Sequence, residues 1–226
     1  TSFELTEAEK NPPDVIPAPP TQPIHHVWHR QKAKKALKLH EIEDENEAAE
    51  KVKDLALEHK ESGRALLVFV RKVEDVEKVI KKLPKNSTEQ LTGTLRGFER
   101  DSLVKKPIFQ RFLPSSNRDS TVTPAPGTVY LVCTSAGEVG VNISADHMVC
   151  DLSTFESMSQ RFGRVNRFGD CDDTQIDVVY PKEFSKKDKK SDSVKVSELD
   201  QRRKKTLELL KQLSGDASPA ALGKLD

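Results

Sequence analysis

Apolar runs and helical patterns alternate along residues 34–181 of this chain. Residues 65–70 (Ala-Leu-Leu-Val-Phe-Val) and 128–134 (Thr-Val-Tyr-Leu-Val-Cys-Thr) are apolar almost throughout, which is typical of strands buried on both faces of a sheet. Apolar residues at helical spacing then predict a helix that ends before Pro84: Val73, Val76, Val79, Ile80 and Leu83. Further strands are expected at residues 36–42, 88–95, 147–152 and 175–180, with helices at residues 43–60 and 98–106, and a capping box at Ser153 and Glu156 that opens the helix of Gln160.

This alternation predicts the fold class and the division of the chain. Strands separated by helices of this length indicate an α/β domain with a mostly parallel sheet over residues 31–181. Residues 1–30 carry six of the thirteen prolines and are expected to be a linker or N-terminal extension. Residues 182–226 begin with a run rich in Lys, Asp and Ser, which indicates a charged linker. An amphipathic helix stopped by Gly215 follows, with its stripe at Leu199, Thr206, Leu207, Leu210 and Leu213.

Composition narrows the functional classes. The charged fraction of 32% exceeds the usual roughly 25%, so charged segments are expected outside the core. The net charge is +1, so any contact with nucleic acid must come from a local patch. The three cysteines lack Cys-x-x-Cys spacing, which argues against a disulfide framework or a zinc site and fits a reducing cytosol. No apolar run approaches the roughly 20 residues that span a bilayer.

Residues 159–169 (Ser-Gln-Arg-Phe-Gly-Arg-Val-Asn-Arg-Phe-Gly) contain a Gln-x-x-Gly-Arg-x-x-Arg pattern. Arg164 and Arg167 are three residues apart, so on a helical turn their side chains would emerge close together. Two guanidiniums at one point can neutralise the charge that spreads over a transferring phosphoryl group. Gln160 lies one helical turn before Arg164, and Gly163 allows a ligand or another backbone to approach. The alternative for such a pair on its own is a solvated basic helix end.

Three polar segments follow expected strands at their carboxyl ends, where open parallel sheets bind ligands. One follows residues 65–70, a second is residues 92–97 (Thr-Gly-Thr-Leu-Arg-Gly), and a third is residues 134–140 (Thr-Ser-Ala-Gly-Glu-Val-Gly). Hydroxyls, backbone amides and arginines grip phosphates without reading bases. We therefore expect contacts to a nucleic-acid backbone from Arg71, Thr92, Gly93, Arg96, Thr134 and Ser135.

These segments resemble, in the same order, the motifs of superfamily-two helicases. Residues 133–143 (Cys-Thr-Ser-Ala-Gly-Glu-Val-Gly-Val-Asn-Ile) look like motif V and residues 159–169 like motif VI, while residues 65–71 and 90–96 look like motifs IV and IVa. The run over residues 144–169 looks most like the helicase–nuclease of CRISPR type I interference. The resemblance covers residues 31–181 and implies the second of two RecA-like domains, a three-layer sandwich with a C-terminal helical tail.

The resemblance implies a role for each matched residue. Arg164 and Arg167 would be arginine fingers that reach ATP, and Gln160 would help to position phosphate or water. Thr134 and Ser135 would touch the nucleic-acid backbone. Many relatives carry Asp at the position of Asn142, whose amide brings no negative charge. The residues that would lie at the nucleotide or couple it to the nucleic acid are Glu138, Gly140, Asn142 and Gly163.

The half of such an enzyme that holds ATP is not found in this sequence. No Gly-x-x-x-x-Gly-Lys-[Ser/Thr] phosphate loop occurs, and no acidic pair follows a buried strand in position to hold Mg²⁺. The resemblance therefore implies that ATP and Mg²⁺ are bound mainly by a first RecA-like domain elsewhere in the same protein. No metal site is expected in this chain, which lacks an initiator Met and is expected to be a fragment with little ATPase activity alone.

The resemblance also implies partners. They would be single-stranded DNA, the first RecA-like domain and the nuclease domain of the same protein, and a CRISPR interference complex. The setting would be the cytoplasm of a prokaryote, without membrane contact.

Two other functions fit parts of the pattern. The motifs contact phosphates and not bases, so another superfamily-two helicase, acting on RNA or in DNA repair, stays open. The other alternative is a non-catalytic doubly wound domain that binds proteins, which leaves the polar residues of motifs V and VI without a role. This alternative predicts that charge reversal at Arg164 leaves the activity of the complete protein intact.

Overall fold

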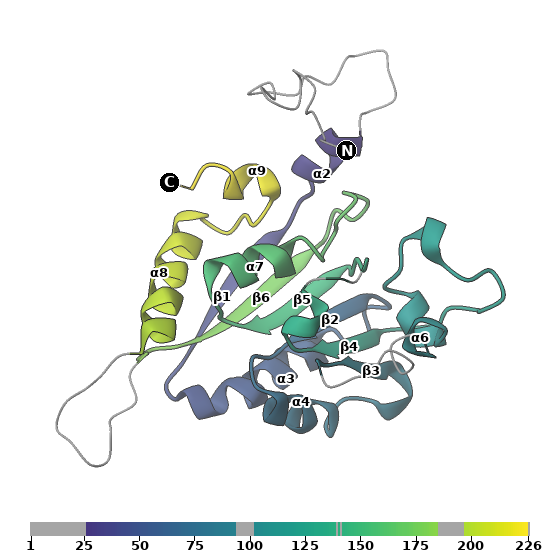
Figure 1. The fold of residues 1–226 in the computed structure, drawn as a ribbon, viewed down its shortest axis with the longest axis horizontal. Coiled ribbons are helices and arrows are strands. Elements are labelled where there is room, and N and C mark those ends of the chain that lie inside the picture. Colours follow the sequence, from purple (N-terminus) through teal and green to yellow (C-terminus); the bar gives the residue numbers. More distant parts are fainter. Residues whose placement is uncertain (1–25, 94–101, 139, 141, 185–196, 226) are drawn as a thin grey trace, which may run out of the picture.

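One parallel sheet organises the chain. The computed structural model describes residues 26–93, 102–138, 140, 142–184 and 197–225. Its strands are β1 (Ala36–Ile42), β2 (Ala65–Phe69), β3 (Thr88–Leu91), β4 (Val129–Cys133), β5 (His147–Asp151) and β6 (Gln175–Pro181). They pair in the order β1-β6-β5-β2-β4-β3, and every neighbouring pair is parallel (Figure 1). The predicted α/β class is confirmed.

Helices cover both faces of this sheet, which gives three layers. One face packs against α3 (Ala48–Glu58) and α4 (Val73–Ile80), and the other against α6 (Pro107–Gln110), α7 (Phe155–Phe162) and α8 (Glu198–Gln212) (Figure 1). Two further helices, α2 (His26–Gln31) and α9 (Pro219–Leu222), are in contact with each other. Short 3₁₀ turns lie at Glu45–Glu47, Lys85–Ser87, Ser115–Asn117 and Ser135–Gly137.

The central strands explain why helices cover both faces. All five residues of β2 and all five of β4 are buried. Leu67 and Phe69 belong to the core under α6 and α7, whereas Leu66 and Val68 belong to the core under α3 and α4. Successive side chains of a strand point to opposite faces, so a sheet covered on both sides requires continuous apolar runs.

Two helix starts differ from the sequence predictions. The helix expected over residues 43–60 begins as a 3₁₀ turn because the side chain of Asp44 caps that turn, and regular α-helix starts only at Ala48. The helix α7 has Thr154 as its N-cap, and Ser153 lies buried before it. The capping box predicted for Ser153 is therefore wrong by one residue.

The C-terminal tail packs on the sheet. Leu207, Leu210 and Leu213 join the core that also holds α7, whereas Leu199 is 43% exposed and lies outside the apolar stripe. The predicted domain boundaries after residues 30 and 181 stay predictions. The helix α2 spans the first of them, and residues 1–25 and 185–196 lie outside the described part of the chain.

A buried carboxylate lies in the middle of β6. The Asp177 side chain is 1% exposed, and its Oδ1 atom lies 2.7 Å from Nε2 of His40 on β1. Its Oδ2 atom accepts a hydrogen bond of 2.7 Å from the side-chain amide of Gln175 and lies 3.8 Å from Nε2 of His59. Burial acts to raise the pKa of Asp177, but the hydrogen bonds from His59, Gln175 and His40 outweigh it and hold the pKa below its usual range.

We predict that Asp177→Asn lowers the free energy of unfolding at pH 7 by about 2 kcal/mol, because it removes a charged hydrogen-bond acceptor from a buried site. A carboxylate with a depressed folded pKa contributes stability above its ordinary pKa of about 3.9 and loses that contribution as the pH falls through the folded value. The difference between the two proteins should therefore narrow below about pH 4. Urea unfolding across this pH range measures it.

The matched control is Asp172→Asn, since the Asp172 side chain is 91% exposed and pairs with the exposed Lys34. Its effect should stay within about 0.5 kcal/mol at every pH. Equal effects of the two variants would contradict the role given to Asp177.

Candidate functional site

The Gln-x-x-Gly-Arg-x-x-Arg segment spans the end of α7. The helix stops at Phe162, and Gly163 is its C-cap. Arg164 and Arg167 therefore lie in the turn after the helix. Their spacing had suggested a shared helical turn, and the structure does not show one. That turn includes Asn166 with a φ of 42°. The two arginines are still neighbours: burial, and then the charge of Arg167, lower the pKa of Arg164.

Both arginines contact the loop that follows β4. Arg164 donates from Nε and Nη2 to the backbone oxygen of Glu138, at 3.0 and 2.6 Å. Nη1 of Arg167 donates to Oδ1 of Asn142 at 2.9 Å, and the backbone amide of Arg167 donates to Oγ of Ser144 at 3.1 Å. We call Arg164, Arg167 and their partners Glu138 and Asn142 the arginine site.

The arginine site has N–H groups left for a ligand. A guanidinium carries five N–H donors, and the bonds to the residues that the structure describes leave Nη1 of Arg164 and most donors of Arg167 unused. Three residues near the two arginines or their partners in the sequence are exposed: Gln160, Gly163 and Gly140. Gly140 has a φ of +79°, a conformation that glycine adopts without strain. Two neighbouring cations with spare donors suit an anionic group such as phosphate.

The carboxylate of Glu138 is used inside the protein. It accepts hydrogen bonds from Nε of Arg161 at 2.8 Å and from Oγ of Ser157 at 2.6 Å. Nη1 of Arg161 donates to the backbone oxygen of Asp151 at 2.8 Å and to its Oδ1 atom at 3.2 Å, and the guanidinium lies 5.0 Å from the ring centre of Phe69. Glu138 therefore anchors α7 to the loop after β4 through its Oε1 atom.

Arg161 is the residue of this site that the sequence analysis missed. Its side chain is 1% exposed. Burial acts to lower its pKa, but the charges of Asp151 and Glu138 outweigh burial and raise the pKa further, so the guanidinium stays charged. Its position between Gln160 and Gly163 was the only signal in the sequence. An arginine is rarely buried unless it is paired, so nothing in the sequence pointed to a buried side chain here.

The same ion-pair network continues to the C-terminal tail. Oδ2 of Asp151 accepts a hydrogen bond of 2.8 Å from the backbone amide of Arg71, whose guanidinium pairs with Glu45. Glu45 also pairs with Arg203 of α8 at 2.7 Å, and the Arg203 side chain is 2% exposed. Arg71 was predicted to contact nucleic acid, but its side chain lies in this internal network and is only 20% exposed.

The other residues expected at a nucleic-acid backbone fall into two groups. Ser135 and Gly93 are exposed just beyond the carboxyl ends of β4 and β3, which are neighbours in the sheet. Thr134 and Thr92 are buried, so little of either side chain reaches solvent. Arg96 lies outside the described residues.

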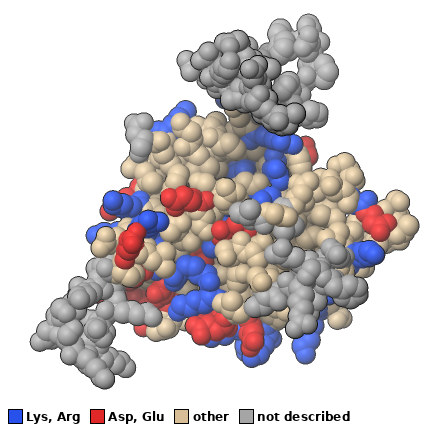
Figure 2. Space-filling view, viewed as in Figure 1, with Lys and Arg blue, Asp and Glu red and all other residues tan. Residues whose placement is uncertain are grey.

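Charge is mixed on the face of the molecule that Figure 2 shows. Lys and Arg side chains lie among Asp and Glu side chains, with uncharged surface between the groups. Among the residues that the structure describes, no three His, Cys, Asp or Glu side chains gather as a metal ion would require. None of the helices in this part of the chain combines the length and apolarity needed to cross a bilayer.

Comparison with known proteins finds a family match in the central part of the chain. Residues 62–170 match the family described as "CRISPR-associated nuclease/helicase Cas3, C-terminal". This stretch of the chain is thus similar to the C-terminal domain of that family. The matched segment contains the loop after β4, α7 and both arginines of the arginine site. No curated protein sequence matches the chain.

Solved structures agree on the fold. The structure of T. fusca Cas3 with AMPPNP matches with a TM-score of 0.55 at 16% identity, over 87% of this chain and 23% of that chain. The structure of T. fusca Cas3 with ADP matches with a TM-score of 0.53 at 16% identity, over 84% of this chain and 24% of that chain. At these identities the likeness shows the RecA-like fold, and the chain spans about a quarter of the length of these Cas3 chains.

We predict that Arg161→Met lowers the free energy of unfolding by about 3–5 kcal/mol, because it leaves the buried carboxylates of Glu138 and Asp151 without their partner. Guanidinium chloride unfolding measures the loss. The control is Arg202→Met, which removes an exposed ion pair with Glu198 on α8 and should cost less than about 1 kcal/mol. If both variants lose the same stability, Arg161 does not hold the site together.

Proposed function

We propose that this chain is the C-terminal RecA-like half of an ATP-dependent DNA translocase that works in CRISPR type I interference. The observation that carries the proposal is the arginine site, with two neighbouring guanidiniums that have spare donors beside the loop after β4. The Cas3-like match over residues 62–170 supports the CRISPR assignment. In this proposal the rest of the motor lies in other parts of a longer protein.

The residues of the arginine site fit a triphosphate that a first RecA-like domain would hold, together with Mg²⁺. Arg164 and Arg167 would turn their spare N–H groups toward the γ-phosphate, and Gln160 would help to position phosphate or water. Asn142 holds Arg167 through a neutral amide, so the full positive charge of Arg167 stays available. Exposed Gly140 and Gly163 leave room for close approach. Hydrolysis of the triphosphate would supply the free energy for movement.

The loop after β4 could couple the nucleotide to DNA. Ser135 and Gly93 are the exposed residues best placed to contact the sugar–phosphate backbone of a single strand. Ser135 lies in the 3₁₀ turn directly before Glu138, whose carbonyl accepts from Arg164 and whose carboxylate accepts from Arg161. A movement of this loop along the DNA strand would therefore change the position of Arg164.

The partners that this proposal implies are single-stranded DNA, the first RecA-like domain and nuclease domain of the same protein, and a CRISPR interference complex in the prokaryotic cytoplasm. The main alternative is a superfamily-two helicase that acts on RNA. Stimulation of the complete protein's ATPase by single-stranded DNA and by single-stranded RNA separates the two.

We predict that Arg164→Ala or Arg167→Ala in the complete protein lowers DNA-stimulated ATP hydrolysis by roughly 10³-fold, because each removes a cation that stabilises the transition state. Arg164→Lys should recover little of the activity, since an ammonium keeps the charge but lacks the forked donors that also hold Glu138. Steady-state phosphate release measures the rate, and circular dichroism checks the fold.

The control is Arg202→Ala, on the exposed face of α8, which should hydrolyse ATP at the wild-type rate. The proposal is wrong if the Arg164→Ala and Arg167→Ala proteins both fold and both hydrolyse ATP at a near-normal DNA-stimulated rate.

A further inference from the structure

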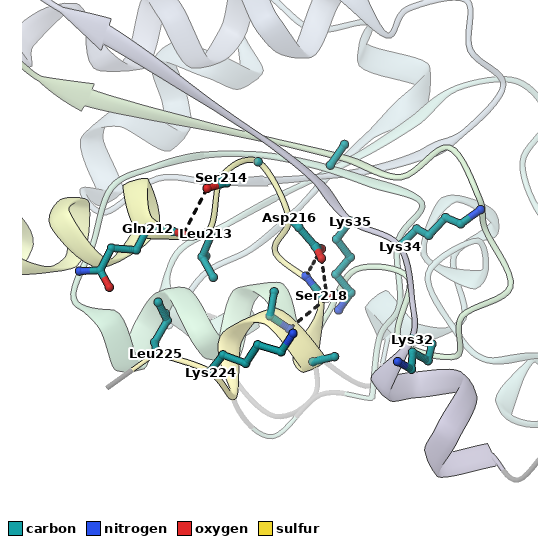
Figure 3. A pocket seen from close by; sticks show the side chains of 14 residues that line it. Lys32, Lys34, Lys35, Gln212, Leu213, Ser214, Asp216, Ser218, Lys224 and Leu225 are labelled. Carbon is teal, nitrogen blue, oxygen red and sulfur yellow. Dashed lines mark hydrogen bonds between the residues drawn. The ribbon is translucent and has the colours of Figure 1, made fainter. Parts of the chain in front are cut away.

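A second concave site lies near the carboxyl end of α7, where Lys35 donates to the carbonyl of Phe162. A cleft of about 700 Å³ opens between residues 32–36, which lead into β1, and residues 212–225 of the tail (Figure 3). Four lysines and one acidic residue, Asp216, line it. Figure 3 shows Lys35, Asp216 and Ser218 side by side on one wall, and Lys34 pointing away from them. The four lysines are Lys32, Lys34, Lys35 and Lys224.

Lys35 is a buried cation with too few partners. Its side chain is almost wholly buried, as the residue is 3% exposed. Its ammonium donates one hydrogen bond, of 2.7 Å, to the backbone oxygen of Phe162. It has no ion pair in the part of the chain that the structure describes, although an ammonium carries three donors. Burial lowers the pKa of Lys35 to about 8, with the charge of Asp216 acting against burial. A buried, unpaired charge is costly, and an anion in the cleft would remove that cost.

Asp216 does not compensate this charge because its carboxylate is already engaged. Its Oδ1 atom accepts from the backbone amide of Ser218 at 2.8 Å, and its Oδ2 atom accepts from the hydroxyl at 3.0 Å. At the rim, Lys32 and Lys224 are exposed. Neither rim lysine has an ion pair with a described residue. The cleft thus holds more positive charge than the protein itself neutralises.

The cleft also has apolar lining residues, and it has room for more than a phosphate. Leu213, Ala220, Ala221 and Leu225 line it. The volume of the cleft lies within the range of roughly 300–1,000 Å³ that is usual for small-molecule sites. A phosphate would contact the lysines while a base or sugar packed on the apolar side chains.

A second cleft, of about 390 Å³, shows the contrast. It is lined by Arg64, Arg111 and Arg118. The guanidinium of Arg111 donates to three backbone carbonyls, Arg118 donates to the carbonyl of Leu113, and Arg64 pairs with Asp173. These cations hold loops together. In the lysine-lined cleft, by contrast, Lys32, Lys35 and Lys224 have no ion pair with any residue that the structure describes.

We propose that the lysine-lined cleft binds the phosphate of a nucleotide, either free or as a unit of a single strand, with its charge against Lys35, Lys32 and Lys224. The site is separate from the arginine site and does not depend on the proposed motor function. It touches that site through Phe162, the last residue of α7, because Lys35 holds its carbonyl and Arg164 follows two residues later. Occupancy of the cleft would therefore act on the turn that carries both arginines.

The test titrates the 226-residue chain with three probes: pyrophosphate, ATP and a fluorescein-labelled ten-nucleotide oligothymidylate. Amide resonances of Ser214, Gly215 and Ser218 should shift on saturation with at least one of the two nucleotide probes. The double variant Lys32→Ala/Lys224→Ala should bind that probe about tenfold more weakly near 50 mM salt. For the oligonucleotide, the slope of log affinity against log salt should fall by about 1.4, since each lost contact to a single strand removes about 0.7.

The matched control is Lys204→Ala/Lys205→Ala, which removes the same charge from exposed positions of α8 outside the cleft. It should leave affinity and salt slope unchanged. Shifts with the oligonucleotide assign the cleft to a strand, and shifts with ATP alone assign it to a free nucleotide. Three results would overturn the cleft proposal. They are shifts with pyrophosphate alone, equal losses of affinity in both double variants, and shifts confined to Ser135, Gly140 and Arg167. The last of these results would leave the motor proposal intact.

Discussion

The buried guanidinium of Arg161 is the constraint on which the candidate site depends. A charge without water must keep its partners, so Glu138 and Asp151 are fixed around it. This fixes the loop after β4 against the carboxyl end of β5 and the start of the arginine turn. The carbonyl of Glu138 is then in place to receive Arg164. A buried ion pair in the interior thus positions the loop that Arg164 contacts.

Much of the fold could be predicted because its signals are local. A strand covered on both sides must be apolar at every position, and residues 65–69 and 129–133 meet that demand. Of the predicted stripe over residues 73–83, Val76 and Val79 of α4 and Leu83 after it are buried, whereas Val73 is 53% exposed. The closeness of Arg164 and Arg167 was also predicted, although a turn and not a helix produces it.

The remaining features depend on contacts between distant residues, which one sequence does not reveal. Arg71 at a strand end has the chemistry of a phosphate ligand, and only the fold places Glu45 within its reach. Glu138 looks equally suited to a nucleotide until Arg161 is seen beside it. The docking of α8 depends on Arg203, which reaches the carbonyl of Leu152 across 51 residues of chain. Ion pairs with residues distant in the sequence therefore give each of these side chains an internal contact that the sequence alone does not show.

The tail also finishes the sheet at the outer side of β1. The amide of Leu37 donates to the carbonyl of Gly215 at 2.8 Å, and the amide of Ala217 donates to the carbonyl of Lys35 at 2.9 Å, so a short antiparallel bridge covers the start of this edge strand. An uncovered strand edge is a template for pairing with another chain. Without α8 and the residues after it, the start of β1 would be an uncovered strand edge again. The segment that encloses the lysine-lined cleft therefore also protects the domain from self-association.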